Sequence, residues 1–154
     1  MEIKRILFAT DFSETSSKAV SCVAEMAKRY GAKLYIVHVI QDIEKVTAWY
    51  APKVNMDELH RTMEARALKE LEKYEKAFEG HKDFECQLLR GVPQQEILKF
   101  KRDNKIDLVI LGTTGSTTDK IMKESRRPVL IVAPRAEITE SKDPRLCSGG
   151  EIRL

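Results

Sequence analysis

Short apolar runs alternate along this chain with longer stretches in which apolar residues recur at helical spacing. The apolar runs predict strands at residues 3–9, 34–40, 84–89, 106–111 and 129–132. The run at 34–40 is apolar at nearly every position, which is typical of a parallel strand covered on both faces. Helices are predicted from a cap at Asp11 or Ser13 to Tyr30, over 56–80, after Pro93, and over 117–125.

This strict alternation predicts an α/β fold with an open five-stranded parallel sheet and helices on both faces. Residues 1–135 form one predicted domain, and the polar, aperiodic stretch 136–154 is interpreted as a tail. Residues 41–55, which include Trp49, have no clear period and are predicted to be a loop. Ligands of such sheets bind beyond the carboxyl ends of the strands, so the candidate segments are 9–13, 39–42, 91–93 and 112–116.

Composition narrows the class of protein. The 154 residues include 27 Lys and Arg against 24 Asp and Glu, and a net charge of +3 does not favour nucleic acid as a partner. No stretch approaches the roughly 20 apolar residues of a membrane helix, and no signal peptide is recognised. The three cysteines, Cys22, Cys86 and Cys147, lie far apart, so a reducing cytoplasm is the expected compartment.

The loop around Gly112 and Gly115 is the most suggestive candidate site. Its glycines allow a close backbone approach, Ser116 and Thr117 carry hydroxyls, and the next helix presents free N–H groups to an anion. The alternative is a tight turn in which Ser116 caps the helix and Asp119 completes a capping box. Spacing alone favours the turn.

Asp11 is the second candidate, either as an acceptor for a ligand amine or hydroxyl or as a helix cap. His38 lies within an apolar strand, where a satisfied core or strand-end histidine is the usual role. No His, Asp and Glu grouping has metal-ligand spacing, and no nucleophile elbow is present. We therefore expect no metal site and no catalytic residue.

These segments together resemble the universal stress protein family. The resemblance rests on residues 6–13 (I-L-F-A-T-D-F-S), 34–40, 91–97, 106–112 and 128–132, and it covers residues 3–134 in order. It implies a five-stranded parallel sheet and a homodimer formed through the last strand, 129–132. Some members bind ATP, holding adenine at the positions of Asp11 and Val39 and the phosphates on a loop of pattern G-x2-G-x9-G-[ST].

This sequence departs from that pattern, because Ser116 follows Gly115 at once and about ten residues between the two halves of the motif are missing. We therefore expect weak or absent ATP binding, with AMP or another small adenine ligand as the remaining possibility. The candidate nucleotide-binding residues are Ala9, Thr10, Asp11, Val39, Leu111, Gly112, Gly115, Ser116 and Thr117.

The leading hypothesis is a cytoplasmic, non-catalytic stress-response protein that regulates or binds an unknown protein partner and is at most a slow ATPase. The alternative within the family is a functional ATP or AMP sensor that uses Asp11, Val39, Gly112, Gly115 and Ser116. An ATP-pyrophosphatase requires S-G-G-x-D-S after the first strand, where residues 10–13 contain no glycine. A flavodoxin-like domain requires a hydroxyl-rich phosphate loop after the first strand. The hydroxyls of Thr10, Ser13, Thr15 and Ser16 match such a loop only loosely.

Overall fold

A computed structural model describes residues 1–42, 53, 55–112 and 115–133. Five parallel strands form one sheet in the order β3-β2-β1-β4-β5. They are β1 (Arg5–Ala9), β2 (Lys33–Gln41), β3 (Phe84–Gly91), β4 (Leu108–Leu111) and β5 (Val129–Ile131). The predicted parallel sheet is thus confirmed, and the strand order reverses between β1 and β4.

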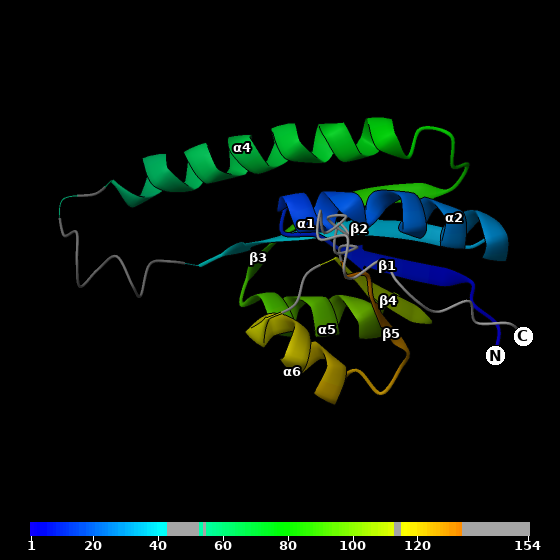
Figure 1. Cartoon of the computed structure of the whole chain (residues 1–154). Helices are drawn as coiled ribbons and strands as arrows, with labels where there is room; N and C mark the ends of the chain where they lie inside the picture. The colour runs from blue at the N-terminus through cyan, green and yellow to red at the C-terminus, as the bar shows by residue number, and fades with distance from the viewer. Residues whose placement is uncertain (43–52, 54, 113–114, 134–154) are drawn as a thin grey trace, which may run out of the picture.

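Helices cover both faces of the sheet (Figure 1). One face carries α1 (Glu14–Lys18), α2 (Val20–Tyr30) and α4 (Met56–Ala77), and the other carries α5 (Pro93–Asp103) and α6 (Ser116–Glu124). Pro93 occupies the first turn of α5, as predicted, where its missing N–H costs nothing. Gly31 ends α2 in the left-handed conformation with φ of 60°, also as predicted.

Two apolar cores lie on opposite sides of the sheet, and β1 contributes to both. Ile6 and Phe8 pack with α2 and α4, whereas Leu7, between them in sequence, packs with α5 and α6. All three side chains are fully buried. This explains why the parallel strands are apolar at successive positions rather than alternate ones.

The predicted single helix ending at Tyr30 is wrong in one respect, because it is divided into α1 and α2 at Ala19. The N–H of Ala19 donates to the carbonyl of Ser16, 3.1 Å away, which is a three-residue rather than a four-residue step. Of the two proposed caps, Ser13 caps α1, since its hydroxyl accepts a hydrogen bond from the N–H of Ser16 at 3.1 Å.

Several sequence predictions lie outside the described residues. They concern most of the loop at 41–55 with Trp49, Cys147, and the tail at 136–154. Within the described part of the chain, none of the helices combines the length and apolar character that crossing a membrane requires.

Candidate functional site

A cavity of about 770 Å³ opens at the carboxyl ends of β1, β2 and β4, where the strand order reverses. This is the place at which open parallel sheets bind ligands, and the volume suits a small molecule. The lining comprises Ala9, Thr10, Asp11, Phe12, Ser13, Val37, His38, Val39, Ile40, Gln41, Met63, Arg66, Ala67, Glu70, Pro93, Ile97, Leu111, Gly115, Ser116, Thr117 and Thr118.

The structure brings together almost all the residues selected from the sequence. Those in the lining are Ala9, Thr10, Asp11, Val39, Leu111, Gly115, Ser116 and Thr117. The exception is Gly112, which is described but does not line the cavity. A side-chain Cβ at Gly112 would lie 2.6 Å from Cα of Ser16, so this glycine allows the exit of β4 to pack directly against α1.

Thr10 links the carboxyl end of β1 to α1 and α4. Its hydroxyl donates to the Tyr74 hydroxyl of α4 at 3.0 Å and accepts from the Ser16 hydroxyl of α1 at 2.8 Å. The N–H of Phe12 also donates to Thr10 Oγ1, at 3.1 Å. Because Thr10 and Ser16 are buried, this network holds the loop that carries Asp11 in one position.

Asp11 itself is exposed at the mouth of the cavity. Its Oδ1 accepts the N–H of Ser13 at 2.9 Å, which orients the carboxylate without making it the cap of α1. Among the described residues Oδ2 has no hydrogen bond, so this oxygen can accept one from a ligand hydroxyl or amine.

His38 forms part of the wall beside Asp11. Its Nδ1 lies 2.8 Å from the carbonyl oxygen of Thr10, and because a carbonyl only accepts, Nδ1 carries the proton and Nε2 is the acceptor of the neutral ring. Burial lowers the pKa of His38, against the opposing effects of the Thr10 carbonyl and Asp11. The histidine is therefore a satisfied strand residue, as predicted, and it also faces the cavity.

Phe12 stacks on His38, with ring centroids 4.1 Å apart and planes 29° from parallel. To reach this position Phe12 adopts a φ of 62°, an uncommon left-handed conformation for a bulky side chain. Phe12 is not among the residues selected from the sequence, because a single phenylalanine between Asp11 and Ser13 gives no signal of such a conformation.

α4 also contributes to the lining, through Met63, Arg66 and Glu70, none of which was selected from the sequence. Their spacing shows that they share one face of α4, because positions three and four apart lie together, but it does not show that this face borders the cavity. Arg66 is the only cation in the described lining, whereas Asp11 and Glu70 are acidic. Glu70 also pairs with Lys73 of the same helix at 2.7 Å.

The amino end of α6 completes the cavity. The prediction that Ser116 caps this helix is wrong, because Ser116 is its first helical residue and Gly115, with φ of 150°, holds the cap position. Among the described residues no side chain caps the helix, so the N–H groups of Ser116 and Thr117 are available to an anion at the same place as their hydroxyls.

The arrangement has the parts of a binding site. Apolar walls from Val39, Ile97 and Leu111 surround one free carboxylate oxygen, one imidazole acceptor and one helix amino end. Within the described residues, no group of three His, Cys, Asp or Glu side chains is placed to hold a metal ion. The cavity can therefore enclose a flat apolar ring and hold polar groups at its edges.

The chain is similar to known proteins of one family. The model of the universal stress protein family matches residues 2–133. The universal stress protein YxiE of Bacillus subtilis is 31% identical over 83% of this chain and 97% of its own. The universal stress protein MJ0531 of Methanocaldococcus jannaschii is 28% identical over 84% of this chain and 81% of its own.

Solved structures show the same fold. The protein MJ0577 superposes with a TM-score of 0.74 and 26% identity, over 88% of this chain and 99% of its own. A universal stress protein in complex with cAMP has a TM-score of 0.66 at 19% identity, covering 86% of this chain and 98% of its own. One from Archaeoglobus fulgidus in complex with dAMP has a TM-score of 0.64 at 18% identity, covering 85% and 98%.

Proposed function

This chain belongs to the universal stress protein family, and from that premise we propose that it is a non-catalytic regulatory member whose cavity holds a small adenine nucleotide and binds ATP weakly or not at all. The observation that carries the proposal is the short connection between β4 and α6. β4 ends at Leu111 and α6 begins at Ser116, so residues 112–115 alone join them.

A four-residue connection has no room for the nine-residue insertion in the phosphate loop of the ATP-binding members it resembles. The backbone N–H groups of that arch are then missing. Each lost hydrogen bond to a charged phosphate oxygen forfeits roughly 1.5–3 kcal/mol, so the loss of two weakens binding about a hundredfold or more. These lost hydrogen bonds would weaken the binding of a triphosphate, but not the contacts with the nucleoside.

The charges in the lining support the same conclusion. Asp11 and Glu70 bring two carboxylates to the cavity, and Arg66 brings one guanidinium. A triphosphate in this cavity would meet more repulsion than a ligand with a single phosphate. The helix amino end at Ser116 supplies one anchor for such a phosphate.

The nucleoside end retains its contacts. The free carboxylate oxygen of Asp11 accepts a hydrogen bond from the ligand, and the backbone of Val39 at the end of β2 holds the adenine edge. The structural relatives described as complexes with cAMP and dAMP each hold an adenine nucleotide with one phosphate, which supports AMP as the first ligand to try.

The test is calorimetric titration of the protein with AMP, ADP and ATP. We expect the protein to bind AMP, and to bind ATP either not at all or with a dissociation constant above the micromolar range. Asp11→Ala should lose AMP binding. The matched control is Asp103→Ala, which removes an exposed carboxylate at the far end of α5. Micromolar ATP binding that Asp11→Ala abolishes would make the chain a functional ATP sensor and contradict the weak-ATP proposal.

The proposal extends to assembly. β5 is an edge strand of the sheet, with half-buried apolar side chains, and a bare apolar edge is a hazard unless it is covered or paired. Pairing of β5 with its copy across a two-fold axis satisfies that edge and gives a homodimer. We place this dimer in the cytoplasm, in keeping with the scattered cysteines, with an unidentified protein as its partner.

A further inference from the structure

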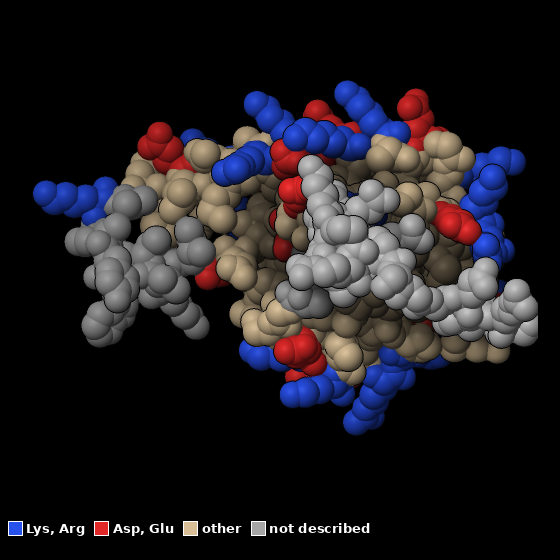
Figure 2. Space-filling model, in the orientation of Figure 1, with Lys and Arg blue, Asp and Glu red and all other residues tan. Residues whose placement is uncertain are grey.

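A second cavity, of about 520 Å³, lies at the amino ends of β1 and β4, on the sheet edge opposite the first. It is lined by Lys4, Arg5, Lys101, Arg102, Lys105, Ile106, Asp107 and Arg127. Six of these side chains are basic and one is acidic. Over the upper helix layer in Figure 2, by contrast, side chains of both signs are mixed.

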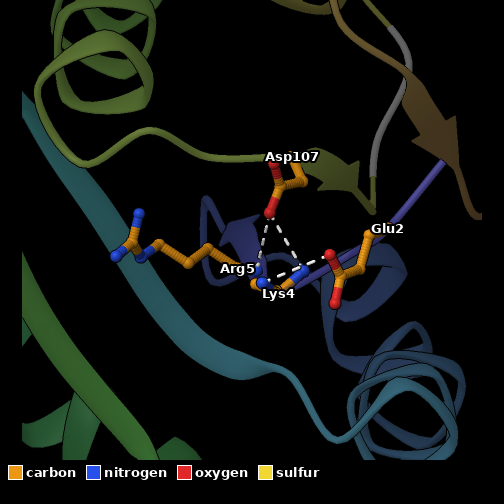
Figure 3. Close-up of polar contacts among 4 residues, drawn as sticks. All are labelled: Glu2, Lys4, Arg5 and Asp107. Atoms are coloured by element: carbon orange, nitrogen blue, oxygen red, sulfur yellow. Dashed lines mark hydrogen bonds and ion pairs between the residues drawn. The ribbon is translucent and has the colours of Figure 1, made fainter.

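The single carboxylate does not balance these cations. Oδ2 of Asp107 accepts the backbone N–H groups of Lys4 and Arg5, at 2.9 and 3.0 Å (Figure 3). The Arg5 side chain extends away from Asp107, and the Lys4 ammonium pairs instead with Glu2 at 3.2 Å. Asp107 therefore serves the backbone at the start of β1.

The cations are not needed to satisfy the carboxyl end of α5 either. The carbonyls of Phe100, Lys101 and Arg102 accept the backbone N–H groups of Asn104, Ile106 and Lys105, at 3.0, 3.0 and 3.2 Å. The turn itself pairs these carbonyls. It therefore largely compensates the partial negative charge that normally attracts basic side chains to the carboxyl end of a helix.

The environment of Lys101 reflects this excess of positive charge. The side chain is largely buried, and its ammonium donates to the carbonyl of Ser125. Burial, together with the nearby Arg102, Arg127 and Arg126, lowers the pKa of Lys101. Its charge therefore lies among others of the same sign.

Four of the lining cations, Arg5, Arg102, Lys105 and Arg127, are exposed and form no ion pair with any other described residue. Three of them are arginines, whose planar guanidinium groups match the oxygens of a phosphate in a bidentate manner. We propose that this cavity is a second ligand site, which binds a small molecule carrying two or more phosphate groups.

The cavity favours a small ligand over a nucleic acid. Its described lining contains no aromatic side chain on which a base can stack. The net charge of +3 over the whole chain also differs from the strongly basic surface of a protein that follows a phosphate backbone. The volume lies within the range of small-molecule sites.

The test compares the wild type with Arg102→Ala/Arg127→Ala, using calorimetric titration with inorganic tripolyphosphate at physiological salt. Both arginines are exposed, so their truncation leaves the core intact. The matched control is Lys69→Ala/Lys76→Ala, which removes the same charge from exposed positions on α4. A sugar bisphosphate, titrated in parallel, distinguishes an organic phosphate ester from inorganic polyphosphate as the source of the ligand.

We expect tripolyphosphate or the sugar bisphosphate to bind the wild type and the control equally, and to bind the double arginine variant at least about tenfold more weakly. Asp11→Ala, in the first cavity, should leave this binding unchanged, so the result is independent of the adenine-nucleotide proposal. Absence of binding, or equal weakening in both double variants, overturns the inference. So does tighter binding of a single-stranded oligonucleotide than of either small probe.

Discussion

A single residue, His38, makes the stability of the folded protein depend on pH. Burial lowers the pKa of its ring below the ordinary 6.5, so the folded protein holds the neutral form at acidities where the unfolded chain is already protonated. Since the unfolded state then binds more protons, the free energy of unfolding falls as pH drops below about 6.5. The fall ends once the pH is below the folded-state pKa.

Urea denaturation from pH 7.5 to pH 5 measures this dependence. We expect the decline in the free energy of unfolding to be smaller in His38→Gln, which keeps a polar side chain but does not titrate. Identical slopes in His38→Gln and the wild type would show that the imidazole does not cause the effect.

Single residues also show what the sequence could and could not predict at the site. Asp11 and Ser116 were selected because strand exits and helix starts carry recognisable residue types, and both lie in the cavity. Arg66 was missed because a helical period shows which face of α4 is buried and not what stands opposite its edge. Phe12 was missed because its left-handed φ of 62° depends on stacking against His38, which is distant in sequence.

At the scale of elements, Gly112 determines how closely β4 approaches α1. An alanine Cβ would lie 2.6 Å from Cα and 2.9 Å from Oγ of Ser16, which forces the helix to move. We expect Gly112→Ala to destabilise the fold by about 1–3 kcal/mol, as overpacking of a close contact does. Since Ser16 also donates to Thr10, nucleotide binding should weaken as well.

Gly80→Ala is the matched control, because a Cβ there has nothing within 4 Å. Urea denaturation of both variants gives the comparison, and Gly80→Ala should remain within about 0.5 kcal/mol of the wild type. Equal stability of the two variants would mean that β4 and α1 separate without cost. That result would remove the packing reason for a glycine at position 112.

The type and order of the elements were predictable because apolar runs and helical spacing reflect burial directly. The break between α1 and α2 was not, since residues 14–30 contain no proline and no glycine to mark it. The break follows from the three-residue hydrogen bond at Ala19, a matter of backbone geometry. Ser116 was misplaced by one position for a similar reason, because Gly115 occupies the cap.

At the scale of the whole molecule, the open edge at β5 determines assembly. β5 pairs only with β4 among the described strands, and its three residues, Val129, Leu130 and Ile131, are half-buried. If two copies pair along this edge, a lysine at Ile131 places two charges near the two-fold axis, where their desolvation and repulsion oppose association. We therefore expect the wild type to be a dimer at micromolar concentration and Ile131→Lys to be a monomer.

Sedimentation velocity over a concentration series measures the assembly, and a thermal melt followed by circular dichroism checks that the variant is folded. Met122→Lys is the matched control, because Met122 is an apolar side chain 52% exposed on α6 rather than on β5. The control should remain dimeric. A monomeric wild type, or a dimer that survives Ile131→Lys, would place the interface elsewhere. The unpaired edge of β5 would then be the natural place to look for the partner protein, since a strand edge recognises any segment that can extend the sheet.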